Sequence, residues 1–86
     1  MNSASNTAAV DLSEDHVKMV FGWNLRRKIN ERRLTQAQFA EIIGTSQQHV
    51  GKWVTGRTIP DLRWLIKICA ALAVSADYLW RDPDAR

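Results

Sequence analysis

Two short amphipathic segments joined by only three residues constrain the fold of this chain more than any other feature. Segments 36–43 and 47–54 each repeat apolar residues at helical spacing, and residues 44–46 separate them. Gly44 permits a sharp turn, and the small Ala40 lets two helix backbones approach. Helices joined in this way must cross steeply and closely.

Local signals mark the ends of both segments. Thr35 and Ser46 are suitable N-caps, Gly44 is a suitable stop for the first helix, and Gly56 is a suitable left-handed stop for the second. The residues predicted to face inward are Phe39, Ala40, Ile43, Val50, Trp53 and Val54. Together these features predict a helix-turn-helix geometry.

Three further helices are predicted around this pair. Caps or starts are predicted at Ser13, at Pro60 and Asp61, and at Ser75, while Leu12 and Val17 are spaced as a hydrophobic staple. The predicted apolar positions are Val17, Phe21, Leu25 and Ile29 in the first helix, Leu62, Leu65, Ile66, Cys69 and Leu72 in the fourth, and Tyr78, Leu79 and Trp80 in the last turn. The sequence therefore predicts a compact all-α domain of five helices over 13–82, after a flexible arm at 1–12 and before a tail at 83–86.

Two glycines fall inside predicted helices. We expect Gly22 to loosen or bend the first helix. Gly51 costs about 1 kcal/mol relative to alanine, so it either serves a close approach to a ligand or reflects neutral drift on an exposed face.

Size and composition exclude several classes of protein. A chain of 86 residues is one domain, too small for a multidomain enzyme. We expect a cytoplasmic protein, because no apolar run approaches the roughly 18 residues of a membrane span and no signal peptide is evident. One cysteine and two histidines form neither a disulfide nor a catalytic or metal-binding set, so no enzyme activity, cofactor, metal or small-molecule substrate is expected.

Positive charge is concentrated in the middle of the chain. Residues 23–67 contain nine Lys or Arg and three Asp or Glu. Such an excess attracts phosphate backbones or simply forms a solvated surface, and the charge alone does not choose between them. No basic residue precedes Lys18, so we do not expect the arm at 1–12 to bind a phosphate backbone.

The third helix carries a polar face opposite its apolar one. That face contains Ser46, Gln47, Gln48, Gly51, Lys52 and Thr55. A glutamine amide can donate to and accept from adenine, and lysine can donate to guanine. Exposed glutamines are also often merely solvated. The side chains on this face therefore suit the recognition of bases, but by themselves they are not evidence for it.

The segment LTQAQFAEIIGTSQQHVGKWVTGR, residues 34–57, resembles the Cro and phage-repressor helix-turn-helix family. The likeness continues through Ile59 and Pro60 to residues 74–79. It implies a transcriptional repressor that binds a near-palindromic site in double-stranded DNA as a homodimer, with reading helices about 34 Å apart. The alternative is an antitoxin-like module that binds a protein partner and regulates its own operon; a long toxin-wrapping tail would favour it.

The resemblance also implies roles for individual residues. Base edges would be met by Gln47, Gln48, Gly51 and Lys52, with Ser46 and Thr55 on the same face. Gln36 would bind a phosphate and brace Gln47. Further backbone contacts would come from Thr35, His49, Arg57 and Thr58.

The chain departs from the family pattern at five positions, one of which is Gly51, where a side chain is missing from a reading position. Val54 and Ile29 stand where a Glu and an Arg often form an ion pair in the family. Replacing that pair with apolar residues affects the expected phosphate contact more than the stability of the fold. Arg33 and Ala73 stand where glycine is frequent, so either left-handed backbone at Arg33 costs roughly 1–2 kcal/mol or the loop there has a different conformation.

Aromatic side chains are numerous for so small a core. Trp80, and after it Trp64 and Tyr78, are predicted contacts between subunits, the alternative being that such rings cover the core from outside. For Trp23 we prefer the interpretation that the ring covers the core from outside to the interpretation that it contacts another subunit.

Overall fold

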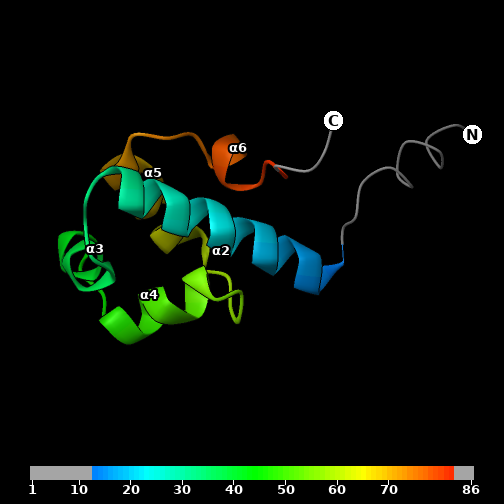
Figure 1. Cartoon of the computed structure of the whole chain (residues 1–86), viewed down its shortest axis with the longest axis horizontal. Helices are drawn as coiled ribbons and strands as arrows, with labels where there is room; N and C mark the ends of the chain where they lie inside the picture. The colour runs from blue at the N-terminus through cyan, green and yellow to red at the C-terminus, as the bar shows by residue number, and fades with distance from the viewer. Residues whose placement is uncertain (1–12, 83–86) are drawn as a thin grey trace, which may run out of the picture.

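The computed structural model describes residues 13–82, and five helices account for most of this span. They are α2 (Glu14–Glu31), α3 (Gln36–Ile43), α4 (Gln47–Val54), α5 (Leu62–Leu72) and α6 (Ala76–Leu79). Within 13–82 there is no strand, which confirms the predicted all-α fold. The predicted arm, its staple residue Leu12 and the tail lie outside the described residues. Figure 1 shows α2 crossing the molecule, with α3 and α4 on one side of it and α6 on the other.

A side-chain cap begins every one of these helices, as predicted. In each case the side-chain oxygen accepts a hydrogen bond from the backbone N–H three residues later, which satisfies a donor that the helix itself leaves unpaired. The capping residues are Ser13, Thr35, Ser46, Asp61 and Ser75. Thr35 forms a full capping box, because the Gln38 side chain accepts in turn from the Thr35 N–H at 2.9 Å.

The core lies where α2, α3 and α4 meet the inner sides of α5 and α6. Its largest fully buried side chains are Phe21, Leu25, Ile29, Phe39, Val50, Ile68, Leu72 and Leu79. The predicted inward positions of α3 and α4 are all buried. In α2 the prediction is confirmed for three of its four positions, whereas Val17 is only partly buried.

The predicted apolar stripe of α5 is wrong at two positions. Leu62 is 69% exposed and Ile66 is 61% exposed, whereas Ile68, which the prediction left out, is fully buried. The side of α5 that meets the core is formed by Leu65, Ile68, Cys69 and Leu72. Nearly every position of this helix is apolar, so two overlapping stripes satisfy helical spacing, and packing against α3 and α6 selects one of them.

Gly22 permits close contact between two helices, and the prediction that it loosens or bends α2 is wrong. The helix runs unbroken through this residue. A Cβ placed at Gly22 would lie 2.6 Å from the carbonyl oxygen of Trp53 and 2.9 Å from that of Val54, closer than such atoms can approach. The glycine therefore lets α2 pack directly on the C-terminal end of α4.

Left-handed backbone occurs at four described residues. The φ angles are 85° at Gly44 and 76° at Gly56, as expected for helix stops. Arg33 and Ala73, which replace frequent glycines, also adopt positive φ, at 59° and 55°. The backbone at Arg33 and Ala73 is therefore left-handed despite its energetic cost, and the loop at Arg33 does not avoid that conformation.

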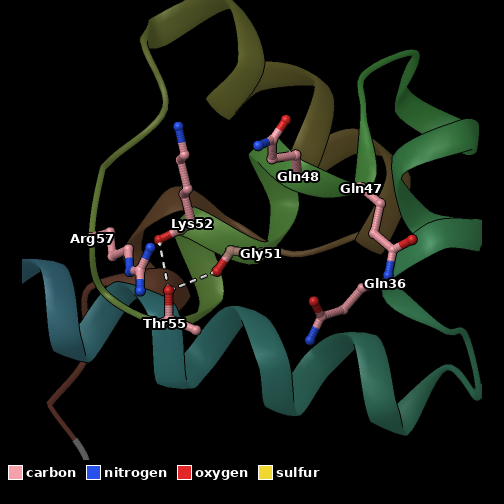
Figure 2. Close-up of a pocket in the computed structure, with 7 residues that line it drawn as sticks. All are labelled: Gln36, Gln47, Gln48, Gly51, Lys52, Thr55 and Arg57. Carbon is pink, nitrogen blue, oxygen red and sulfur yellow. Dashed lines mark hydrogen bonds between the residues drawn. The ribbon is translucent and has the colours of Figure 1, made fainter.

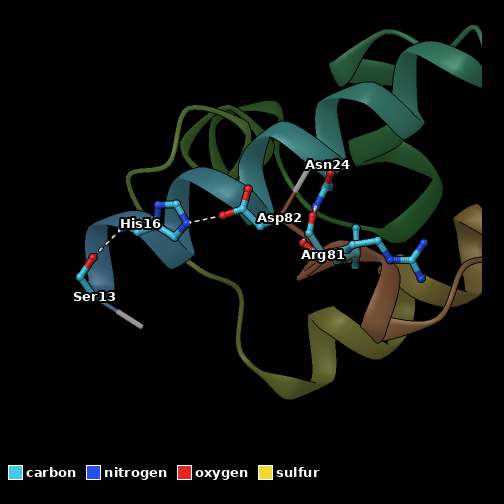
Figure 3. A network of polar contacts seen from close by, with 6 residues as sticks. Ser13, His16, Asn24, Arg81 and Asp82 are labelled. Carbon is cyan, nitrogen blue, oxygen red and sulfur yellow. Dashed lines mark hydrogen bonds and ion pairs between the residues drawn. The ribbon is translucent and has the colours of Figure 1, made fainter. Parts of the chain in front are cut away.

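Polar contacts fasten the segment after α6 to α2 (Figure 3). The buried Asn24 side-chain amide donates to the carbonyl oxygens of Leu79 at 3.0 Å and Arg81 at 2.8 Å. Nearer the start of α2, His16 Nε2 lies 2.7 Å from Asp82 Oδ2. The last described residues are therefore held along α2.

Glycine-to-alanine variants in two helices test the close contact. Gly22→Ala should lower the free energy of unfolding by about 1–3 kcal/mol, because its methyl group meets backbone atoms that cannot rotate away. Gly51→Ala should instead raise it by up to about 1 kcal/mol, since a Cβ there has only Gln36 Oε1 nearby, at 3.9 Å. Thermal or urea denaturation measures both variants. A Gly22→Ala protein as stable as the parent would contradict the proposed packing.

Candidate nucleic-acid interface

The orientation of α4 follows from the turn that precedes it. Gly44 ends α3 in left-handed backbone, and its N–H and that of Thr45 both donate to the Ala40 carbonyl oxygen at 2.9 Å. Ala40 itself is 2% exposed, which fits the predicted close crossing of α3 and α4. Val50 and Trp53 then anchor α4 in the core, so its opposite side faces outward.

That outward side forms an open groove of about 520 Å³ (Figure 2). The residues that line it are Gln36, Gln47, Gln48, Gly51, Lys52, Thr55 and Arg57. Gln36 and Gln47 lie at one end, and Lys52 and Arg57 lie at the other. The structure therefore brings together seven of the predicted site residues, drawn from α3, from α4 and from the loop after α4.

The chemistry of the groove is that of amides and cations. Three of its seven lining residues are glutamines, two are basic and none is acidic. Gln47 and Gln48 are exposed at the first turn of α4. Such a face can both donate to and accept from a polar ligand while attracting negative charge. Gln36 and Gln47 share one end of the groove, and the brace between them remains a prediction.

The floor of the groove lies at Gly51. The nearest atom outside its own helix to the position of its missing Cβ is Gln36 Oε1, at 3.9 Å, which is an ordinary contact distance. The Thr55 hydroxyl donates back to the Gly51 carbonyl oxygen at 2.7 Å, so its proton is engaged by the helix (Figure 2). Thr55 thus contributes its methyl group and a hydroxyl oxygen to the groove rather than a free donor.

The predicted backbone-contact residues lie around the ends of α3 and α4. Thr35 caps α3, and Ser46 caps α4. Arg57 and Thr58 follow α4, and their N–H groups donate to the Lys52 carbonyl oxygen at 2.9 Å and 3.3 Å. The loop that carries the Arg57 side chain is thereby held against the helix.

The sequence prediction omitted Thr45, which positions a predicted site residue. Thr45 Oγ1 lies 2.8 Å from His49 Nδ1, and the His49 ring stacks on Trp53 with centroids 6.4 Å apart. These two contacts fix the imidazole beside the first turn of α4. The signal in the sequence was the spacing of four residues between a turn hydroxyl and a helical histidine.

The three predicted subunit-contact aromatics all cover the core in part. The Trp80 ring packs on Phe21 with centroids 5.0 Å apart and stays 36% exposed. Trp64 packs on Trp53 at 6.3 Å. Tyr78 is partly buried under Lys28, whose Nζ lies 4.9 Å from the ring centroid. Their role between subunits remains a prediction, as does the role of the half-exposed Trp23.

Other reactive groups lie apart from the groove. Burial raises the pKa of the Cys69 thiol, which therefore stays protonated near neutral pH. Across residues 13–82 no three His, Cys, Asp or Glu side chains gather as metal ligands would, and no helix of that region is long and apolar enough to cross a membrane.

Comparisons with known proteins agree on one fold and motif. The sequence profile of a family described as "Helix-turn-helix" matches residues 25–79. An "SPbeta prophage-derived uncharacterized HTH-type transcriptional regulator YonR" from Bacillus subtilis is 31% identical over 67 residues, which are 78% of this chain and 62% of that protein. This chain therefore matches less than two thirds of that relative's length.

Two solved structures share the arrangement of helices. LexA from Eubacterium rectale, an SOS-response transcriptional repressor, matches with a TM-score of 0.77 and 26% identity, over 84% of this chain and 77% of that one. The restriction-modification controller protein C.AhdI from Aeromonas hydrophila matches with a TM-score of 0.68 and 26% identity, over 72% of this chain and 94% of that one.

Proposed function

The chain belongs to the helix-turn-helix family of the Cro and lambda-repressor type, and from this premise we propose that it is a DNA-binding transcriptional regulator whose α4 reads duplex DNA. We further propose that it represses transcription from a near-palindromic operator. The named relatives support this direction: one is a transcriptional regulator from a prophage, and another is a repressor. The exposed amide face of α4 is the observation that carries the proposal.

Base reading is assigned to the first turns of α4. A helix fits the major groove of DNA, which is about 12 Å wide, and side chains near its start reach base edges. Gln47 and Gln48 are exposed there and can recognise adenine, while Lys52 can donate to guanine. Gly51 leaves space between them in which a thymine methyl group would fit. Ser46 and Thr55 complete the reading face.

Phosphate contacts are assigned to the rim of the groove. Thr35, Gln36 and His49 lie near the starts of α3 and α4, and Arg57 and Thr58 lie at the other end. Contacts on both sides of α4 would hold it in register along the duplex without carrying sequence information. Positive charge at Lys52 and Arg57 would supply the electrostatic part of the affinity.

The proposed regulator acts as a homodimer. One helix of eight residues reads few base pairs, whereas two helices about 34 Å apart read both halves of a palindrome. Trp80, Trp64 and Tyr78 are the aromatic candidates for contacts between the subunits.

Alanine variants of the two exposed glutamines test base reading. Duplexes bound by the parent chain are first selected from a random pool. On the selected duplex, Gln47→Ala or Gln48→Ala should cost about 1–3 kcal/mol and blur the base preference at one position, because a bidentate contact is lost. On random duplexes the loss should be small. The control is Asn30→Ala, which removes an exposed amide near the C-terminal end of α2. Equal losses on both duplexes would show that the glutamines do not read bases.

The salt dependence of binding tests Arg57. Arg57→Ala should weaken binding to all duplexes to a similar degree and lower the slope of log K against log salt by about one unit, because one phosphate contact is lost. Fluorescence anisotropy across a salt series measures this slope. Arg81→Ala is the matched control, since Arg81 is exposed just after α6, and α2 lies between α6 and α4 (Figure 1). A slope unchanged in Arg57→Ala would remove this residue from the phosphate contacts.

A further inference from the structure

The His49 ring lies on the flank of α4 opposite to Gln47. Successive residues of a helix are about 100° apart, so His49 stands about 200° around α4 from Gln47. Gln47 shares the groove with Gln36, whereas His49 is not among the residues that line it. The ring instead stacks on Trp53, with centroids 6.4 Å apart. The groove and the His49 ring therefore occupy two different flanks of the same helix.

Two contacts hold the His49 ring in one orientation. Thr45 Oγ1 lies 2.8 Å from Nδ1, and one face of the ring rests on Trp53, which is 5% exposed. Trp53 is packed in turn against Trp64 of α5, with ring centroids 6.3 Å apart. His49 itself is exposed, and within residues 13–82 no hydrogen bond reaches its Nε2. One nitrogen of the ring is thus engaged by the protein, and the other is left for a ligand.

The Thr45 hydroxyl suits a neutral imidazole that binds an anion through Nε2. In neutral imidazole one nitrogen carries the proton and the other accepts a hydrogen bond. Phosphate oxygens only accept, so a neutral ring that binds phosphate through Nε2 carries its proton there and must accept at Nδ1. A threonine hydroxyl can donate to that acceptor, and the Thr45 hydroxyl has no other hydrogen-bond partner in the described part of the chain.

We propose that Thr45 positions His49 as a neutral phosphate donor: Thr45 Oγ1–H donates to Nδ1, and Nε2–H donates to a phosphate oxygen of duplex DNA. This inference rests on the proposed function and deepens it, since it identifies the nitrogen that binds and the residue that orients it. Linked hydrogen bonds of this kind strengthen one another. A helix in the major groove lies between two phosphate backbones, so Gln36 would meet one backbone and His49 the other.

This contact differs in kind from the one proposed for Arg57. A cation that binds a phosphate releases a counterion from the duplex, so its contribution to affinity falls as salt rises. A neutral N–H group releases no counterion and therefore adds affinity with little dependence on salt. Because phosphates are the same along any sequence, the contribution of His49 is also the same on every duplex. Salt dependence and sequence dependence together distinguish His49 from both Arg57 and the glutamines.

Variants that keep the shape of each side chain test the pair. His49→Phe retains a ring that can stack on Trp53 but has no nitrogen. Thr45→Val retains the branched shape but has no hydroxyl, and Thr45→Ser retains the hydroxyl. Circular dichroism checks that all variants fold. Affinity is measured by fluorescence anisotropy across a salt series, on the duplex selected from a random pool and on random duplexes.

His49→Phe should weaken binding about tenfold on both kinds of duplex and leave the salt slope unchanged, because a hydrogen bond to phosphate is lost but no charge is. Thr45→Val should weaken binding about threefold, and Thr45→Ser should bind as the parent does. The double variant Thr45→Val/His49→Phe should bind no more weakly than His49→Phe alone, since Thr45 acts through His49. A Thr45→Val protein that binds as the parent does, or losses that add in the double variant, would overturn this role of Thr45.

The protonated nitrogen can be identified without altering Thr45. Two-bond nitrogen–proton NMR spectra are recorded for the labelled parent bound to its selected duplex at about pH 8, above the range in which histidine usually titrates. The chain contains two histidines, so the spectrum of His49→Phe assigns the signals. His49 should carry its proton on Nε2 and accept a hydrogen bond at Nδ1. A proton on Nδ1, in a neutral or a charged ring, would overturn this inference while leaving the proposed function intact, whereas a parent that binds no duplex would overturn both.

Discussion

The outward orientation of the polar face of α4 depends on the direct contact between the backbones of α2 and α4. Gly22 is the residue that permits this contact, because any side chain there would collide with the carbonyl groups of Trp53 and Val54. With its inner side pressed against α2 and joined to α3 by a three-residue turn, α4 has little freedom to rotate. The backbone that carries its glutamines therefore has one orientation before any ligand arrives, which reduces the entropy lost on binding.

Features set by neighbours in the sequence were predictable, and features set by distant neighbours were not. Each cap is a contact over three residues, so Ser13 or Thr35 could be identified locally. The role of Gly22 depends on residues about thirty positions later, which spacing within α2 cannot show. The inner side of α5 was also misjudged, since an almost wholly apolar helix leaves the choice of Ile68 over Ile66 to tertiary packing.

The candidate site was predicted more completely than the core of α5. Its residues come mainly from one helix, and the anchors Val50 and Trp53 define which side of that helix is free. The sequence prediction did not include the side-chain rotamers that give the hydrogen bonds from Thr55 to the helix backbone and between Thr45 and His49, although the spacing of Thr45 and His49 is compatible with such a contact. The roles of these positions come from the resemblance and remain predictions.

The attachment of the last described residues to α2 has a practical consequence. Asn24 and His16 hold Arg81 and Asp82 against α2, and α6, which precedes these two residues, lies across α2 from α4 (Figure 1). A reporter or affinity tag fused directly after Asp82 would leave the molecule on the side of α2 away from the proposed reading surface.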